Sequence, residues 1–159
     1  FRRRGCKLLP TPTKFFVTAG SAEGKSELTA FDNALLQARV GNVNLIRVSS
    51  ILPPGAQFNP DLQLPPGSLV PIAYGSIVSD VPGELISAAI AVGISADTFG
   101  VIMEFSGKCS QAEAESAVVA MVREAFASRK MELKDIKVAA TEHRVQETGC
   151  AFAAAPLWY

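Results

Sequence analysis

The sequence is poor in the residues that bind metals or form disulfide bonds. Its 159 residues include three cysteines, Cys6, Cys109 and Cys150, and a single histidine, His143. The cysteines are odd in number, lie far apart and show no CxxC spacing, which argues against a disulfide framework and against a zinc site. They are typical of free thiols in a reducing compartment. We therefore expect a cytoplasmic protein without a bound metal.

The sequence also lacks an excess of charge and a long apolar segment. The 15 Lys and Arg residues balance 15 Asp and Glu residues, so nothing in the net charge favours nucleic acid or an anionic membrane as a partner. No apolar stretch reaches the roughly 18–20 residues of a membrane-spanning helix. The N-terminal segment is too rich in proline, and its apolar part too short, to resemble a signal peptide. We expect neither nucleic acid nor a membrane as a partner.

The common cofactor and hydrolase motifs are missing as well. No GxGxxG follows a strand pattern, and there is no phosphate-binding loop with its lysine. A Ser-His-Asp hydrolase would have to use His143, and no GxSxG motif supports that role. His143 lies inside a strand pattern without spaced metal partners, so we assign it no function.

The pattern of apolar residues predicts one domain, residues 1–159, rich in strands. The composition is 48% apolar, which is ample for a packed core. Thr29 predicts the start of a helix that extends to about Arg39, and a capping box at 110–113 begins a second helix that extends to about Ser128. The helices do not alternate regularly with the strands, which favours an α+β fold. The expected strands are 14–20, 42–49, 69–79, 84–94, 100–105, 136–145 and 150–157, with a proline-rich surface loop at 57–67.

A pair of serines at the end of one strand is the best candidate for chemistry. Ser49 and Ser50 close the strand 42–49, and Pro53 and Pro54 follow at once. Most such pairs are ordinary turn residues. This pair stands out because a strand precedes it, a double proline fixes the direction of the chain after it, and Asn44 lies near enough in sequence to share a site.

Six motifs in this order resemble the pyruvoyl-dependent arginine decarboxylase family, from about Phe16 to the end of the chain. They are AFDNALL at 30–36, GNVNLIRVSS at 41–50, AYG at 73–75, SDVPGE at 79–84, IME at 102–104 and GCAFAAA at 149–155. The expected fold is then a layered αββα sandwich of mainly antiparallel strands with two main helices. Pro156 stands where the resemblance predicts alanine, and it predicts an interruption of the last strand.

The resemblance implies that the chain cuts itself between Ser49 and Ser50. The Ser50 hydroxyl would attack the Ser49 carbonyl, and the resulting ester would eliminate and hydrolyse to leave residues 1–49 and a chain 50–159 that begins with a pyruvoyl group. Asn44 could donate an amide N–H to the oxyanion of the first step. The alternative is that Asn44 is a strand-edge residue bonded to the backbone. The cofactor would be this covalent pyruvoyl group, with no pyridoxal phosphate and no metal.

Three further residues take their expected roles from the same resemblance. Glu104 is the candidate proton donor, because its apolar neighbours should raise its pKa; otherwise it points to solvent from an edge strand. Asp32 is the candidate partner of the substrate guanidinium, with Leu35 as an apolar wall for the methylene groups. The alternative for Asp32 is a role in capping the helix that follows Thr29.

The family resemblance also implies a trimer, or a pair of trimers, with each site between adjacent subunits. The expected reaction is decarboxylation of L-arginine to agmatine and CO2. Two alternatives remain open: a decarboxylase of the same fold that acts on another basic amino acid, and an uncleaved, non-catalytic homo-oligomeric binding protein. The apolar stretch at 151–157 is compatible with a buried strand or with an interface.

Overall fold

The computed structural model describes residues 9–159, so Cys6 lies outside the described residues. The N-terminal half contains β1 (Lys14–Phe15), β2 (Thr18–Glu23), α1 (Glu27–Gln37), β3 (Asn44–Arg47), β4 (Ile51–Leu52), β5 (Gln57–Phe58) and β6 (Leu69–Ser79). It is followed by β7 (Leu85–Ser95), β8 (Gly100–Gly107), α2 (Gln111–Ser128), β9 (Leu133–Arg144) and β10 (Gly149–Trp158). Two helices and a majority of strands confirm the α+β class.

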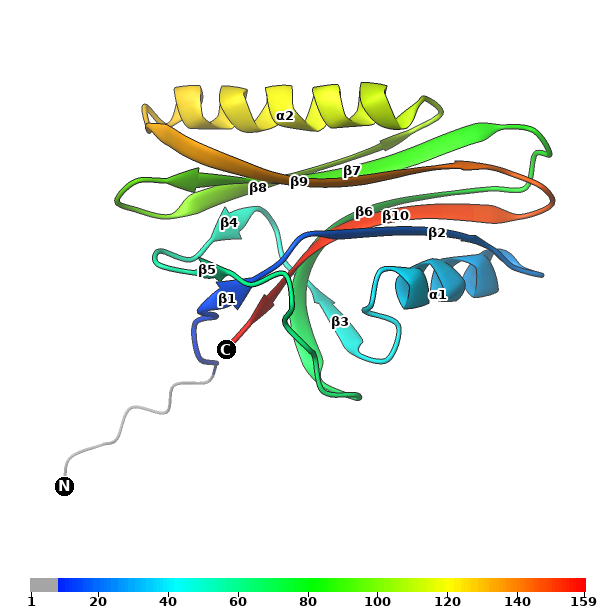
Figure 1. Ribbon diagram of the computed structural model, residues 1–159, viewed down its shortest axis with the longest axis horizontal. Helices are drawn as coiled ribbons and strands as arrows, with labels where there is room; N and C mark the ends of the chain where they lie inside the picture. The colour runs from blue at the N-terminus through cyan, green and yellow to red at the C-terminus, as the bar shows by residue number, and fades with distance from the viewer. Residues whose placement is uncertain (1–8) are drawn as a thin grey trace.

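The strands form two sheets (Figure 1). One has six strands in the order β3-β6-β10-β1-β5, with β2 also paired to β10, and the other has four in the order β4-β8-β7-β9. Of the eight strand pairings in residues 9–159, only β1 with β5 and β3 with β6 are parallel. β3 and β4 are therefore end strands of different sheets, although they follow one another in the chain.

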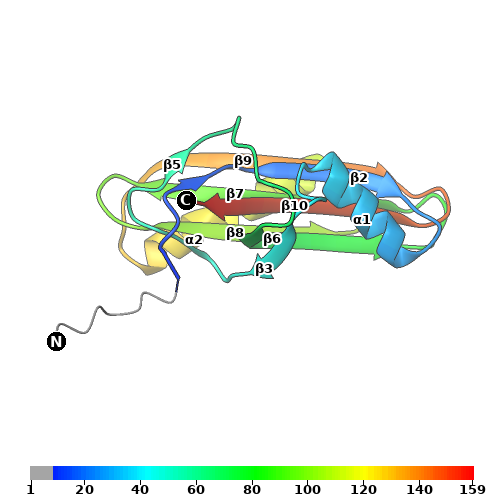
Figure 2. The same cartoon turned by 90° about the horizontal axis from the view of Figure 1, so that it is seen from below.

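The core has three parts, each between two layers. Ile90 and Ile102 of the four-stranded sheet meet Ala151 and Ala153 of β10 in a cluster between the sheets. A second cluster lies under α1, which contacts β2, β10 and β6, and a third lies under α2, which contacts β7, β8 and β9. Figure 2 shows α1 on the near side of the strands and α2 behind them. β10 is buried on both faces, which explains its nearly continuous apolar sequence.

The start of α1 differs from the prediction. Its N-cap is Ser26, whose hydroxyl accepts the Thr29 backbone N–H, while the Thr29 hydroxyl accepts the N–H of Ser26. Thr29 is thus the third helical residue and not the cap, because a threonine can complete a capping box as a glutamate does. The prediction for α2 is confirmed, with Ser110 and Glu113 forming the capping box.

Pro156 does not interrupt the last strand, and that prediction is wrong. β10 continues through it to Trp158 with Pro156 opposite Ile72 of β6. On its other side, Phe16 donates its N–H to the Pro156 carbonyl at 3.4 Å, and proline has no N–H to return the bond. The missing N–H of Pro156 faces the segment around Phe16. There the predicted strand 14–20 is divided into β1 and β2.

The remaining strands follow the predictions closely. β6, β7 and β8 begin within a residue of their expected positions, and β9 begins three residues early. The strand at 42–49 is shorter than expected, since β3 covers only Asn44–Arg47, and the loop 57–67 contains the two-residue strand β5. Among residues 9–159, neither helix has the length and apolar character needed to span a bilayer.

Candidate active site

The Ser49–Ser50 bond lies where the chain leaves one sheet for the other. Before it, Val48 donates its N–H to the Ile72 carbonyl of β6. After it, the Ser50 carbonyl accepts the Ile102 N–H of β8 at 2.7 Å, and β4 continues that pairing. Ser49 is exposed and Ser50 half-buried. Both sides of this bond are therefore attached to the sheets, and a cut between them would leave each new end anchored.

Glu104 lies two residues beyond Ile102 on β8, on the same face of that strand. β4 pairs with β8 only at Gly100 and Val101, so Glu104 lies beyond that pairing, opposite Ile90 of β7, and its side chain is 31% exposed. A β-carbon added at Gly75 of β6 would lie 3.2 Å from the Glu104 β-carbon, so the side chain starts in the space between the sheets. Burial raises the pKa of Glu104, as expected, and the nearby Arg47 partly opposes the rise.

Arg47 is the charged neighbour of Glu104. Its guanidinium nitrogen lies 3.8 Å from a Glu104 carboxylate oxygen, and the same nitrogen donates to the Tyr74 carbonyl at 2.9 Å. The guanidinium carbon lies 4.5 Å from the centre of the Tyr74 ring. Sequence reasoning missed Arg47, although it stands inside the motif that carries the serine pair.

Asn44 lies at the opposite end of β3 from the serine pair. Its side-chain amide donates to the Gly67 carbonyl at 3.2 Å, and its backbone N–H donates to Ser68. A strand rises about 3.3 Å per residue, so β3 alone separates Asn44 from Arg47 by about 10 Å. Within one chain the contact observed is the strand-edge bond to the backbone.

Asp32 and Leu35 lie three residues apart on α1, and they differ in exposure. Asp32 is exposed in the middle of the helix, because α1 begins at Glu27, so it does not lie in the first turn. It lines a cavity of about 860 Å³ together with Glu23, Lys25, Glu147 and others. Leu35 is 8% exposed and packs in the core under α1. Neither Ser50 nor Glu104 is among the residues that line this cavity.

Comparison with known proteins decides which family this arrangement represents. Residues 14–159 match the family model of pyruvoyl-dependent arginine decarboxylase. The chain is 56% identical over 150 residues to the curated pyruvoyl-dependent arginine decarboxylase of Methanocaldococcus jannaschii, covering 93% of this chain and 91% of that protein. It is 43% identical over 152 residues to the protein of the same name from Pyrococcus horikoshii, covering 94% of this chain and 96% of the other.

The chain belongs to the pyruvoyl-dependent arginine decarboxylase family.

The residues around position 50 fit the prosthetic group of a pyruvoyl-dependent arginine decarboxylase. Residue 50 is half-buried and its carbonyl accepts an N–H from β8, while Ser49 on the other side of the bond is exposed. Glu104, whose carboxyl pKa is raised, lies two residues beyond Ile102 on β8, the residue that donates to the Ser50 carbonyl. Within residues 9–159, no three potential metal ligands lie close enough together to hold an ion.

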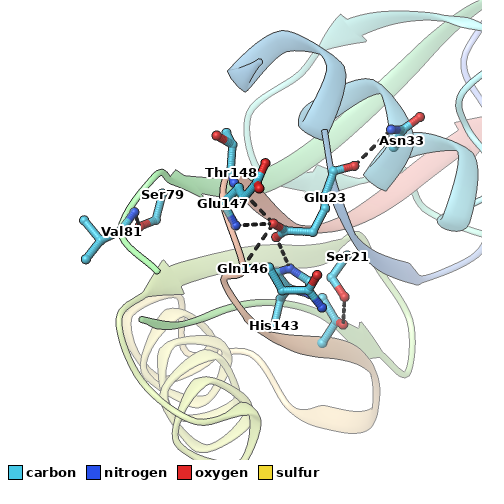
Figure 3. Close-up of polar contacts among 10 residues, drawn as sticks. Ser21, Glu23, Asn33, Ser79, Val81, His143, Gln146, Glu147 and Thr148 are labelled. Atoms are coloured by element: carbon cyan, nitrogen blue, oxygen red, sulfur yellow. Dashed lines mark hydrogen bonds and ion pairs between the residues drawn. The ribbon is translucent and has the colours of Figure 1, made fainter. Parts of the chain in front are cut away.

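A second polar cluster in this decarboxylase connects the two sheets at β2 and β9 (Figure 3). One oxygen of Glu23 lies 2.5 Å from His143 Nε2, and the other accepts the backbone N–H groups of Gln146, Glu147 and Thr148. Burial alone would raise the pKa of Glu23, but these hydrogen bonds outweigh it and lower the pKa. His143 therefore has a structural partner that its sequence position did not indicate.

We expect Glu23→Gln to destabilise the fold by about 1–3 kcal/mol at neutral pH, because a neutral amide oxygen accepts the three backbone N–H groups more weakly than a carboxylate does and carries no charge for His143. Since folding lowers the pKa of Glu23 from 4.5, its contribution is complete above that value and is lost as the pH falls through the folded pKa. Urea unfolding between pH 3 and 8 should show the deficit shrinking in acid. Glu132→Gln, an exposed residue, is the control. A deficit that stays constant with pH would contradict the assignment.

Proposed function

We propose that this chain decarboxylates L-arginine to agmatine and CO2, using a pyruvoyl group made from its own Ser50. Membership of the family supports the reaction and the covalent cofactor. The observation that carries the assignment to these residues is that the Ser49–Ser50 bond joins two sheets beside a half-buried carboxyl group. The pyruvoyl ketone supplies the electron sink that loss of CO2 requires.

Self-cleavage at Ser49–Ser50 is the first step of the proposal. The Ser50 hydroxyl attacks the Ser49 carbonyl carbon, and the peptide C–N bond breaks as the ester forms. Loss of the Ser50 α-proton then breaks the ester C–O bond and releases the Ser49 carboxylate, which leaves dehydroalanine at residue 50. Water hydrolyses this group to the pyruvoyl ketone and ammonia. The products are residues 1–49 and 50–159, each still attached to its own sheet through β3 or β4. The proposed role of Asn44 is to donate an amide N–H to the oxyanion, for which it would have to leave the Gly67 carbonyl or act from a neighbouring subunit.

Glu104 is the proposed proton donor to the substrate carbon after CO2 departs. An acid must be protonated at the working pH to act in this way. Its raised pKa favours the protonated form, and its position near residue 50 on β8 gives it access to the reacting carbon.

Asp32 and Leu35 are proposed to bind the guanidinium and the methylene groups of arginine. They lie on α1 and not beside Ser50 and Glu104, so these two groups would be brought together across an interface between subunits. The side chains next to the cut support this proposal: Ile46 on β3 is 45% exposed and Ile51 on β4 is 44% exposed. Both belong to end strands, where an unpaired edge and an apolar surface favour a partner.

We propose a trimer or a pair of trimers as the assembly, with the site between adjacent subunits. We assign the two sheets and two helices of each chain to an αββα sandwich, in keeping with the core clusters under α1, between the sheets and under α2. A cytoplasmic location is proposed from Cys109 and Cys150, which are free thiols.

A CO2-release screen against arginine, lysine and ornithine tests the function. We expect arginine to be preferred, because two hydrogen bonds from a planar guanidinium suit a carboxylate at Asp32. Asp32→Asn should raise the KM for arginine at least about tenfold, since a charge-assisted pair contributes about 1.5–3 kcal/mol. Asp97→Asn, which changes an exposed acid in the turn between β7 and β8, is the matched control. Equal activity on all three amino acids in the unaltered enzyme would overturn the assignment to arginine.

A further inference from the structure

We propose that Arg47 is a positioning residue for the decarboxylation: its guanidinium, anchored on Tyr74, holds the Glu104 carboxyl in place beside residue 50. The inference rests on the proposed role of Glu104 as proton donor. Arg47 is thus given a role of its own, beside those proposed for the serine pair, Glu104 and Asp32.

The Arg47 side chain is held at two points, although 57% of it is exposed. It stacks on the Tyr74 ring at 4.5 Å and donates to the Tyr74 carbonyl at 2.9 Å. The Tyr74 ring is itself packed against Phe152, with the ring centres 5.4 Å apart, and Phe152 is fully buried. A long surface side chain usually loses much of its charge effect to its own mobility. Here the contacts with an immobile ring keep the positive charge in one place.

Glu104 has few positions open to it. The absence of a side chain at Gly75 leaves just enough room for its β- and γ-carbons, which would lie 3.2 and 3.4 Å from an added β-carbon. Gly75 faces it from β6 and Ile90 pairs with it on β7, and neither carries a charge. The charged group that the structure sets against this carboxyl is Arg47, 3.8 Å away.

The distance of 3.8 Å is too long for a hydrogen bond but short enough for the opposite charges to attract each other. Burial raises the pKa of Glu104, and Arg47 is the group that limits the rise. In the proposed role, the pair limits both where the carboxyl points and how readily it gives up its proton. A proton donor needs both properties to be matched to the reaction.

A lysine at position 47 could not make the three contacts of the Arg47 guanidinium at once. The planar guanidinium stacks on a ring, donates to a carbonyl and faces a carboxylate at the same time, whereas an ammonium group is a point charge. Arg47→Lys should therefore keep the charge and lose the fixed orientation. Arg47→Gln should lose both.

The direct test measures the Glu104 carboxyl in the uncut Ser50→Ala chain, where no turnover takes place. With 13C-labelled glutamate, the Glu104 signal is identified by its absence in Glu104→Gln and titrated by NMR. Adding Arg47→Gln should move its pKa upward, because the opposing positive charge is gone. Arg47→Lys should restore most of the parent value, and Arg123→Gln, which removes an exposed arginine from α2, should leave it unchanged. An Arg47→Gln titration identical to the parent would overturn the proposal.

The second test uses the self-cleaved enzyme and the pH profile of kcat. We expect Arg47→Gln to lower kcat by about 10- to 100-fold, the effect of a misplaced catalytic group, with KM changed less than about twofold. The limb on which kcat falls at high pH should move to higher pH, because Glu104 then holds its proton longer. A loss confined to KM, or an unmoved limb, would overturn the proposal. Full activity in Glu104→Gln would overturn the proposed role of Glu104 as proton donor. The Arg47 variants test only the role of Arg47, so the two failures can be told apart.

Discussion

Replacing Ser50 with alanine should leave one uncut chain with no decarboxylase activity. The methyl group cannot attack the Ser49 carbonyl, so no ester forms and the peptide bond survives. The attachments on either side of this bond are made by backbone groups, Val48 to Ile72 and Ile102 to Ser50, so the variant should fold normally. Intact mass under denaturing conditions, with CO2 release from arginine, measures both effects.

Ser49→Ala is the matched control for this prediction. It changes the neighbouring hydroxyl and keeps both the carbonyl that is attacked and the Ser50 hydroxyl that attacks it. The control should still give fragments 1–49 and 50–159, with the second carrying the mass of a pyruvoyl end. CO2 release from the Ser50→Ala chain would refute the pyruvoyl assignment. So would an unaltered enzyme that is active while its chain is unbroken.

Local patterns in the sequence predicted much of the fold. The strict alternation at 86–94 predicted β7, and the Ser110 and Glu113 pair predicted the start of α2. These features depend on neighbouring residues and on hydrogen bonds that close within one turn. The start of α1 was missed because two possible caps, Ser26 and Thr29, stand in the same turn and hydrogen-bond to each other.

Contacts between distant residues could not be predicted in the same way. Glu23 and His143 are 120 residues apart, and nothing near either one indicates the other. Arg47 was overlooked because its partners, Tyr74 and Glu104, are brought to it by β6 and by the second sheet. The resemblance supplied Ser50, Glu104, Asn44, Asp32 and Leu35 as candidates. That one chain keeps Asp32 and Leu35 on α1, away from Ser50 and Glu104, and leaves Asn44 at the far end of β3, emerges only when the strands and helices are in place.

Glu104→Gln should slow decarboxylation far more than it weakens substrate binding. A glutamine keeps the size of the side chain over Gly75 but cannot supply an acidic proton. General acid catalysis contributes about 100- to 10,000-fold, so kcat should fall within that range. KM for arginine should change by less than about threefold, because the proposed binding groups are on α1 and not on β8. Steady-state CO2 release at several arginine concentrations separates the two constants.

The same Glu104→Gln protein must be shown to cut itself, because Glu104 lies on the strand that holds the Ser50 carbonyl. We expect full conversion to 1–49 and 50–159, since the attack on Ser49 uses the Ser50 hydroxyl and not an acid on β8. Glu124→Gln, which removes an exposed acid from α2, should match the unaltered enzyme in both constants. If kcat were unchanged and only KM rose, Glu104 would be a binding residue. An uncut Glu104→Gln chain would instead move its role to the formation of the pyruvoyl group.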